Sequence, residues 1–262
     1  MIQLRQYVKV QSIEEAYELN QKKNNVIIGG MHWLKMTSRN ADTAIDLSGL
    51  GLDKIEETDE AFEIGCMVTL RDLELNEALN AYCDGAVRDA VKDIVGTQFR
   101  NTATIGGSIY GRYGFSDVLT VFLGMDTYVV CHNAGEIPLL EYSKLKYDRD
   151  IIVKIVVKKR PLKMSYLTIR RTRTDFPVLA CAVSELDGKF QAVIGARPGK
   201  ARLVLDEKDI LKDGISLESA TKFGEYVSKS VNFSSNMRGS AEYRKTTCAV
   251  LVRRSLMKIA DK

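Results

Sequence analysis

Two pairs of adjacent glycines are the residues of this chain with the clearest potential for chemistry. Gly29 and Gly30 form the first pair, Gly106 and Gly107 form the second, and each pair follows a short apolar or β-branched run. Glycine has no Cβ, so a pair at the end of a strand lets the backbone turn with its N–H groups exposed. Successive exposed N–H groups form concavities that bind anions such as phosphate. Two such turns brought together predict a main-chain site for the pyrophosphate of a dinucleotide.

Other phosphate and nucleophile motifs are missing from the sequence. No GxGxxG follows a strand, and no GxSxG is present. The segment 195–201, GARPGKA, has one residue too few between its glycines for a P-loop, and Ala201 stands where Ser or Thr would bind Mg²⁺. These absences argue against a Rossmann fold, a P-loop nucleotidase and a nucleophile-elbow hydrolase.

The number and spacing of the cysteines and histidines limit the metal sites that this chain could form. The five cysteines are Cys66, Cys83, Cys131, Cys181 and Cys248, and no two of them have CxxC spacing. We therefore expect neither an iron–sulfur cluster nor a structural zinc bound by this chain alone. His32 and His132 are the only histidines, which is too few for a His-rich metal site.

Composition is that of a globular protein. The 262 residues suffice for one large or two medium domains, and 38 Lys and Arg against 34 Asp and Glu give a net charge of +4. That charge is too small to predict nucleic-acid binding. No apolar run approaches the roughly 18 residues of a membrane helix, and the N-terminus does not resemble a signal peptide. We expect a cytoplasmic protein without membrane contact.

The elements that position the glycines are predicted from periodicity and capping. A helix over 12–23 begins at Ser12, whose spacing to Glu15 is that of a capping box. It lies in a strand–helix–strand order over 7–28 that ends with a strand at 26–28. Further strands are predicted at 44–47, 62–66, 127–131 and 151–159, an extended segment at 101–109, and helices from Thr69, over 80–94 and after Asp117.

A change of pattern follows Pro161. Strands are predicted at 164–169, 178–186 and 189–196, with Asp187 and Gly188 forming a tight hairpin turn. Helices over about 217–230 and after Ser240 close the chain. Strands followed by helices predict a separate α+β layer.

With their flanks, the glycine pairs resemble a known family. Residues 27–34 resemble the first pyrophosphate loop of the flavoprotein subunit of molybdenum hydroxylases, the family of the carbon monoxide dehydrogenase medium subunit and the xanthine dehydrogenase FAD domain. The segment RNTATIGGSI at 100–109 resembles the second loop of that family. Asp117 stands where the family has an aspartate that bonds the ribityl chain of the flavin. The segment SAEYRKTTCAVLVRRSL resembles the end of the C-terminal domain, so the likeness covers nearly the whole chain.

The resemblance implies a fold and its division. The fold is α+β, a two-subdomain FAD-binding fold of the PCMH/vanillyl-alcohol-oxidase type, followed by a smaller α+β C-terminal domain of antiparallel strands and helices. The FAD-binding domain is expected at 1–160, with subdomains about 1–52 and 53–160, and the C-terminal flavoprotein domain at 161–262.

The resemblance also implies the cofactor-binding residues. They are Ile27, Ile28, Gly29, Gly30, Met31, His32, Trp33, Leu34, Ile94, Thr104, Ile105, Gly106, Gly107, Ser108, Asp117 and Ile152. No catalytic residue and no metal ligand is assigned. The sequence departs from the family pattern at residues 31–33, where a small polar and an acidic residue are usual, and at Ser108, where Asn is usual. Arg112 is expected either to contact a phosphate or to face solvent, and the sequence favours neither.

The implied function is that of an FAD-dependent oxidoreductase subunit, xanthine dehydrogenase-like, in a heterotrimer with an iron–sulfur subunit and a molybdopterin subunit. It would pass electrons between the iron–sulfur subunit and NAD or another acceptor. One alternative is a stand-alone FAD-dependent reductase, for which Arg170, Arg171 and Arg173 are the candidate substrate-binding residues. Another is a non-catalytic nucleotide-binding scaffold subunit.

Overall fold

The computed structural model describes residues 1–261, and the chain divides between two units that each draw on several segments. Unit 1 consists of Met1–Asp72, Thr97–Gly111 and Thr127–Lys158, and unit 2 of Leu73–Gly96, Arg112–Asp126 and Lys159–Lys262. The domain boundary expected at residue 160 stays a prediction.

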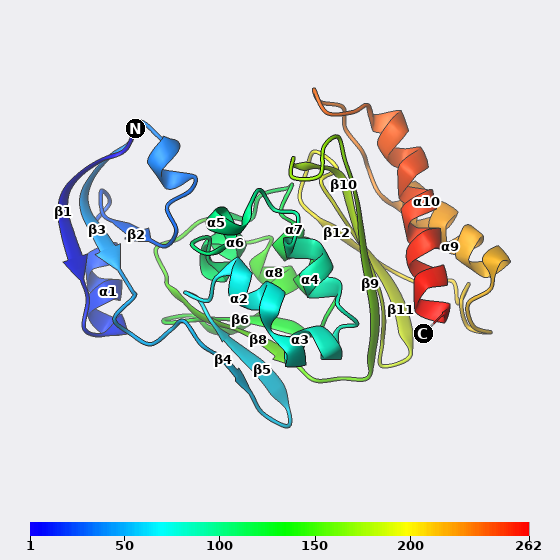
Figure 1. Cartoon of the computed structure of the whole chain (residues 1–262), viewed down its shortest axis with the longest axis horizontal. Helices are drawn as coiled ribbons and strands as arrows, with labels where there is room; N and C mark the ends of the chain where they lie inside the picture. Colours follow the sequence, from blue (N-terminus) through cyan, green and yellow to red (C-terminus); the bar gives the residue numbers. More distant parts are fainter. Residues whose placement is uncertain (262) are drawn as a thin grey trace. The chain divides into compact units, whose positions relative to one another are not determined.

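A three-stranded parallel sheet with one helix forms the N-terminal part of unit 1. Its strands are β1 (Gln3–Lys9), β3 (Asn40–Asp46) and β2 (Val26–Ile28), in the spatial order β1-β3-β2 (Figure 1). Helix α1 (Ile13–Asn20) begins at Ser12, whose Oγ accepts from the amide of Glu15 at 3.1 Å. The predicted strand–helix–strand order is confirmed, and β2 is left at the edge of this sheet.

A five-stranded antiparallel sheet forms the rest of unit 1. Its order is β4 (Ile55–Glu57), β5 (Ala61–Gly65), β8 (Ile152–Lys158), β6 (Thr127–Cys131) and β7 (Gly135–Pro138). Short helices α5 (Thr97–Arg100), α6 (Ile105–Gly111) and α8 (Leu139–Tyr142) accompany it. The strands predicted near 62–66, 127–131 and 151–159 are confirmed.

Two predicted elements are wrong. The segment 101–109 is not extended, because Ile105–Gly111 forms helix α6 with the second glycine pair in its first turn. Tertiary partners favour the helix, since the amides of Ile105 and Gly106 donate to the carbonyls of Val68 and Cys66, both at 2.9 Å. The helix predicted over 80–94 is two helices, α3 (Glu77–Tyr82) and α4 (Ala86–Val91), because Asp84 and Gly85 are left-handed with φ of 54° and 78°.

Unit 2 is built on a four-stranded antiparallel sheet. Its order is β12 (Arg202–Leu205), β11 (Lys189–Gly195), β10 (Pro177–Leu186) and β9 (Leu162–Arg170). The predicted hairpin turn is confirmed, with φ of 49° at Asp187 and 73° at Gly188. Helices α9 (Leu217–Ser230) and α10 (Ala241–Ala260) are also confirmed (Figure 1).

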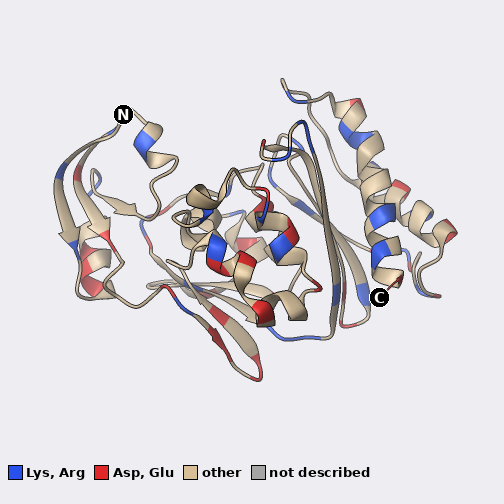
Figure 2. Cartoon of the chain, viewed as in Figure 1, with Lys and Arg blue, Asp and Glu red and all other residues tan. Residues whose placement is uncertain are grey.

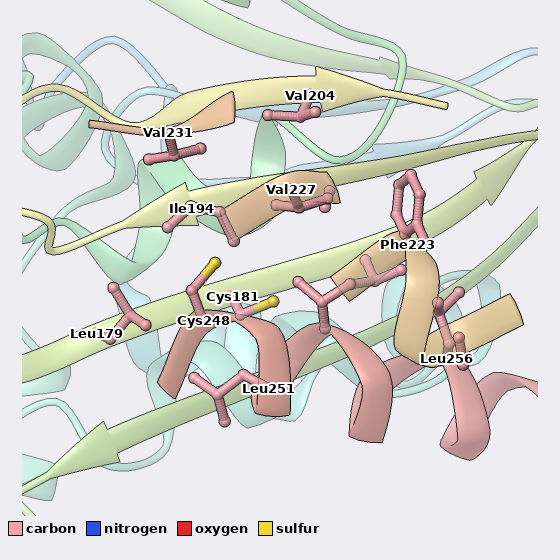
Figure 3. Close-up of a cluster of buried hydrophobic side chains, with 14 of the residues drawn as sticks. Leu179, Cys181, Ile194, Val204, Phe223, Val227, Val231, Cys248, Leu251 and Leu256 are labelled. Atoms are coloured by element: carbon pink, nitrogen blue, oxygen red, sulfur yellow. The ribbon is translucent and has the colours of Figure 1, made fainter. Parts of the chain in front are cut away.

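Strand β10 is buried on both faces. One face meets α9 and α10 in an apolar cluster (Figure 3) that includes Leu179, Cys181, Phe223, Val227, Cys248 and Leu251. The other face packs against α7 (Asp117–Phe122), and Ser184 Oγ donates to the carbonyl of Gly124 at 2.7 Å. Burial on both faces explains why the strand reads as a nearly continuous apolar run.

The longest helix, α10, carries several Lys and Arg residues (Figure 2). Among residues 1–261, no helix combines the length and the apolar character that crossing a membrane requires.

Candidate functional site

The two glycine segments lie against each other in unit 1. A Cβ on Gly29 would stand 2.8 Å from Thr104 Oγ1, and one on Gly30 would overlap the carbonyl oxygen of Thr102. Neither glycine has a positive φ, which in this loop occurs at Met31 instead, at 58°. The first pair is therefore required by the close approach of the second segment, and a side chain at either position would force the two apart.

His32 adds a polar contact between the same segments. Its Nε2 lies 2.7 Å from Thr102 Oγ1, and its ring lies over Phe99 with 3.8 Å between the ring centroids. Burial lowers the pKa of His32, and the charge of Lys35 lowers it further. The neutral imidazole is therefore favoured in the folded chain.

Unused main-chain donors are concentrated in the first loop. Within residues 1–261, none of the amides from Gly29 to His32 donates a backbone hydrogen bond. The second pair differs, because Gly106 donates to the carbonyl of Cys66 and Gly107 to Thr104 Oγ1 at 3.2 Å. The expectation that both pairs expose their N–H groups is wrong for the second pair. Close packing explains the first of those glycines, since a Cβ on Gly106 would stand 2.6 Å from Cys66 O.

A cavity of about 460 Å³ opens beside the two loops, entirely within unit 1. Eight predicted residues line it: Ile27, Ile28, Gly29, Leu34, Thr104, Gly106, Gly107 and Ile152. Edge strand β2 runs along this cavity, since Val26, Ile27 and Ile28 all border it. The cavity is within the size range of cofactor sites and combines apolar walls with unused main-chain donors.

Several lining residues were missed by the sequence analysis. They include Asn20, Asn25, Arg39, Cys66, Tyr110, Tyr147 and Arg149. Helical spacing would have found Tyr110, which follows Gly106 by four residues on α6, had that segment been predicted as a helix. The others come from turns and strand ends and carry no local signal.

The remaining predicted residues do not border this cavity. Gly30, Met31, His32 and Trp33 belong to the first loop, and Ile105 and Ser108 to α6. Ser108 Oγ donates to the carbonyl of Thr104 at 2.9 Å. Ile94 and Asp117 belong to unit 2.

Asp117 is the first residue of α7 and is almost completely buried. Its Oδ1 accepts from the hydroxyl of Tyr166 at 2.6 Å and from Arg170 Nη2 at 2.7 Å. Burial raises the pKa of Asp117, and the charge of Arg170 and the Tyr166 hydroxyl oppose that rise. Burial also raises the pKa of Tyr166 well above its ordinary value.

Unit 2 contains a second cavity, of about 300 Å³. Phe115 and Phe176 contact each other in its wall with 4.7 Å between their ring centroids. Arg238 lies over the Phe176 ring at 4.8 Å.

The unit 1 cavity fits the diphosphate half of a dinucleotide. The amide of Gly29 borders the cavity and would supply a donor for a phosphate oxygen, and Gly107 leaves space on the cavity side of α6. The charged side chains that line it are two basic ones, Arg39 and Arg149, and two acidic ones, Asp148 and Asp150.

Comparison with known proteins agrees with this fit. The family described as the FAD-binding domain in molybdopterin dehydrogenase matches residues 2–159. The Escherichia coli K12 protein YgfM is 29% identical over 255 residues, covering 95% of this chain and 94% of YgfM. The nicotine 6-hydroxylase medium subunit of Paenarthrobacter nicotinovorans is 26% identical over 271 residues, covering 96% of this chain and 95% of that subunit.

The fold is also that of a solved structure. A chain of the carbon monoxide dehydrogenase from Hydrogenophaga pseudoflava superimposes with a TM-score of 0.87 at 20% identity, covering 100% of this chain and 99% of that one. This likeness confirms the expected α+β two-subdomain FAD-binding fold. The match over residues 2–159 shows that the chain belongs to the FAD-binding family of molybdopterin dehydrogenases, with FAD as its cofactor.

Proposed function

We propose that this chain is the FAD-binding electron-transfer subunit of a multi-subunit, molybdopterin-dependent hydroxylase or dehydrogenase. Its partners are an iron–sulfur subunit and a molybdopterin subunit in a heterotrimer, and it passes electrons between the iron–sulfur subunit and NAD or another acceptor. The single observation that carries the proposal is the unit 1 cavity, where edge strand β2 and both glycine segments meet in a chain of this family. The xanthine dehydrogenase-like character and the cytoplasmic location are parts of the same proposal.

The chain's own residues bind and orient the cofactor. The main-chain amide of Gly29, which borders the cavity, would donate to the diphosphate, and Gly106 and Gly107 would let the diphosphate lie close to α6. Ile27, Ile28 and Ile152 give the cavity apolar walls that exclude water. The bound flavin supplies the redox chemistry. The role of Asp117 as the ribityl partner stays a prediction.

The described residues contain no metal-ligand cluster, which supports the proposal that the iron–sulfur and molybdopterin groups are bound by separate subunits. Residues 1–261 contain no group of three or more His, Cys, Asp or Glu side chains that is arranged to hold a metal ion. The five cysteines are all buried, and none of them forms a disulfide. The nicotine 6-hydroxylase relative is named as a medium subunit, which is the position that we propose for this chain.

The stand-alone reductase is the weaker candidate. Its proposed substrate-binding arginines are engaged within unit 2: Arg170 pairs with Asp117, Arg171 donates to the carbonyl of Met237, and Arg173 pairs with Asp93 at 2.8 Å. An anionic substrate would compete with the buried Asp117 carboxylate for Arg170 and with Asp93 for Arg173.

Purification with the neighbouring gene products tests the proposal. We expect a complex of this chain with an iron–sulfur protein and a molybdopterin protein that releases FAD on denaturation, and whose flavin is reduced by NADH without air. A complex that releases no FAD would contradict the FAD site. A yellow chain that turns over NADH alone and never assembles would favour the reductase.

A further inference from the structure

Arg149 joins the two walls of the unit 1 cavity by hydrogen bonds to main-chain oxygens. Its Nη1 donates to the carbonyl of Asn20 at 2.6 Å and reaches that of Asn25 at 3.5 Å. Its Nη2 donates to the carbonyl of Lys23. One guanidinium thus bridges three carbonyls in the turn that connects α1 to β2.

The contact is reciprocal. Asn20 Nδ2 donates to the carbonyl of Arg149 at 2.8 Å, and Gln21 Nε2 donates to the same oxygen at 3.1 Å. Asn20 and Asn25 are buried and Arg149 is half-buried, so the bonds between Arg149 and Asn20 are partly shielded from water, whereas those to Lys23 and Gln21 are exposed. Hydrogen bonds from an ionised donor are stronger than neutral ones, and shielding preserves that advantage.

The two segments joined in this way lead directly into the cavity walls. Residues 20–25 precede β2, which carries the first glycine pair immediately after its last residue. Arg149 precedes Ile151 and Ile152, which line the same cavity at the start of β8. Asn20, Asn25 and Arg149 themselves border the cavity.

We infer that Arg149 is a positioning residue for FAD: it clamps the α1–β2 turn to the start of β8 and so sets the width of the cavity before the cofactor arrives. The inference rests on the proposed placement of FAD in this cavity. Holding the walls in place in advance removes part of the ordering cost of binding. Arg149 acts through the backbone of residues 20–25, because its two terminal nitrogens are already used on carbonyl oxygens.

Lysine cannot replace this residue. A guanidinium presents five N–H donors in a rigid planar fork, whereas an ammonium is a single point on a flexible stem. Arg149→Lys keeps the positive charge and loses the bridge, so it separates the geometric role from an electrostatic one.

The test measures FAD affinity for the full chain after removal of the cofactor. Arg149→Lys is expected to weaken FAD binding about tenfold, mainly through faster release. Arg88→Lys is the matched control, because Arg88 Nε also donates to a main-chain carbonyl, that of Glu74 at 3.2 Å, but in unit 2. Methylguanidinium, with tetramethylammonium as the ionic control, is expected to restore FAD affinity to Arg149→Ala at a concentration that leaves the thermal unfolding of the variant unchanged, which separates positioning from a general loss of stability.

A milder variant, Asn20→Ala, tests the same clamp if the Arg149 variants do not fold. Asn20→Ala removes one of the two bonds donated to the Arg149 carbonyl, and is expected to weaken FAD binding and to show non-additivity with Arg149→Lys. Unchanged FAD affinity in both Arg149→Lys and Asn20→Ala would overturn the clamp. If Gly107→Val also leaves FAD affinity unchanged, the cavity itself is wrongly assigned, and if it abolishes binding, the clamp alone fails.

Discussion

His32 Nε2 lies 2.7 Å from Thr102 Oγ1, and this contact joins the first glycine loop to the segment that leads into the second. The His32 ring also covers Phe99, at 3.8 Å between centroids. The side chain of His32 therefore attaches its own loop, which carries the unused amides, to the neighbouring segment. Its partner side chain comes from a segment 70 residues away in sequence.

Removing this tether is expected to weaken FAD binding. His32→Ala loses one hydrogen bond, for which a net value of about 1 kcal/mol predicts roughly a fivefold rise in the dissociation constant. Fluorescence titration of the flavin measures it. His132→Ala is the control, because His132 packs on Tyr17, with 5.0 Å between the ring centroids, and does not line the cavity. If both variants raised the dissociation constant of FAD equally, the His32 contact would have no specific role in FAD binding.

The same residue predicts a pH dependence. Because burial lowers the pKa of His32 below its ordinary value of about 6.5, the folded chain favours the neutral ring. Its contribution to stability is complete above that ordinary value and is lost as the pH falls through the lower folded value. Thermal unfolding at descending pH should show wild type losing more stability than His32→Gln. Parallel curves for the two proteins would contradict this.

Gly107 gives a direct test of the cofactor site. It lines the cavity, and a Cβ there would meet only Thr104 Oγ1, at 3.1 Å, so small side chains are compatible with folding. We expect Gly107→Ala to reduce FAD retention and Gly107→Val to abolish it, because the side chain occupies space that the diphosphate needs. The flavin-to-protein absorbance ratio measures retention. Full retention in a folded Gly107→Val chain would disprove the site.

Local signals predicted much of this fold. The hairpin at Asp187 and Gly188 and the helices that begin at Ser216 and Ser240 depend on turn and capping residues, and those effects act within a few positions. The turn at the first glycine pair was also predicted, because the pair follows a short apolar strand.

Tertiary contacts decided the parts that the sequence analysis missed. Thr102, Thr104 and Ile105 favour an extended chain, yet α6 forms because Cys66 and Val68 supply acceptors for its first amides. Arg149 was missed for the same reason, since its partners at residues 20–25 are more than a hundred positions away. Such pairings have no local pattern.

The buried ion pair of unit 2 predicts a large stability effect. Arg170→Met would leave the Asp117 carboxylate buried with only the Tyr166 hydroxyl, and breaking such a pair costs about 3–5 kcal/mol. Urea unfolding of the full chain measures it. The double variant Asp117→Leu, Arg170→Met should recover most of the loss, because no unpaired charge remains. A double variant that is no more stable than Arg170→Met would show that the pair is not the cause.

Thiol chemistry provides a further test of packing. All five cysteines are buried and outside disulfides, and burial raises the pKa of Cys66 and that of Cys248 to about 12. At about pH 8 such a thiol is ionised roughly once in ten thousand molecules, and the thiolate is the reactive form. We therefore expect the folded chain to react with a disulfide reagent at none of its cysteines, and the urea-unfolded chain to react at all five.

Cys66 borders the cavity, so comparing Cys66→Ser with wild type identifies any reaction there. Rapid labelling of Cys66 in the folded chain, prevented by added FAD, would show that the cavity opens more widely than this packing allows.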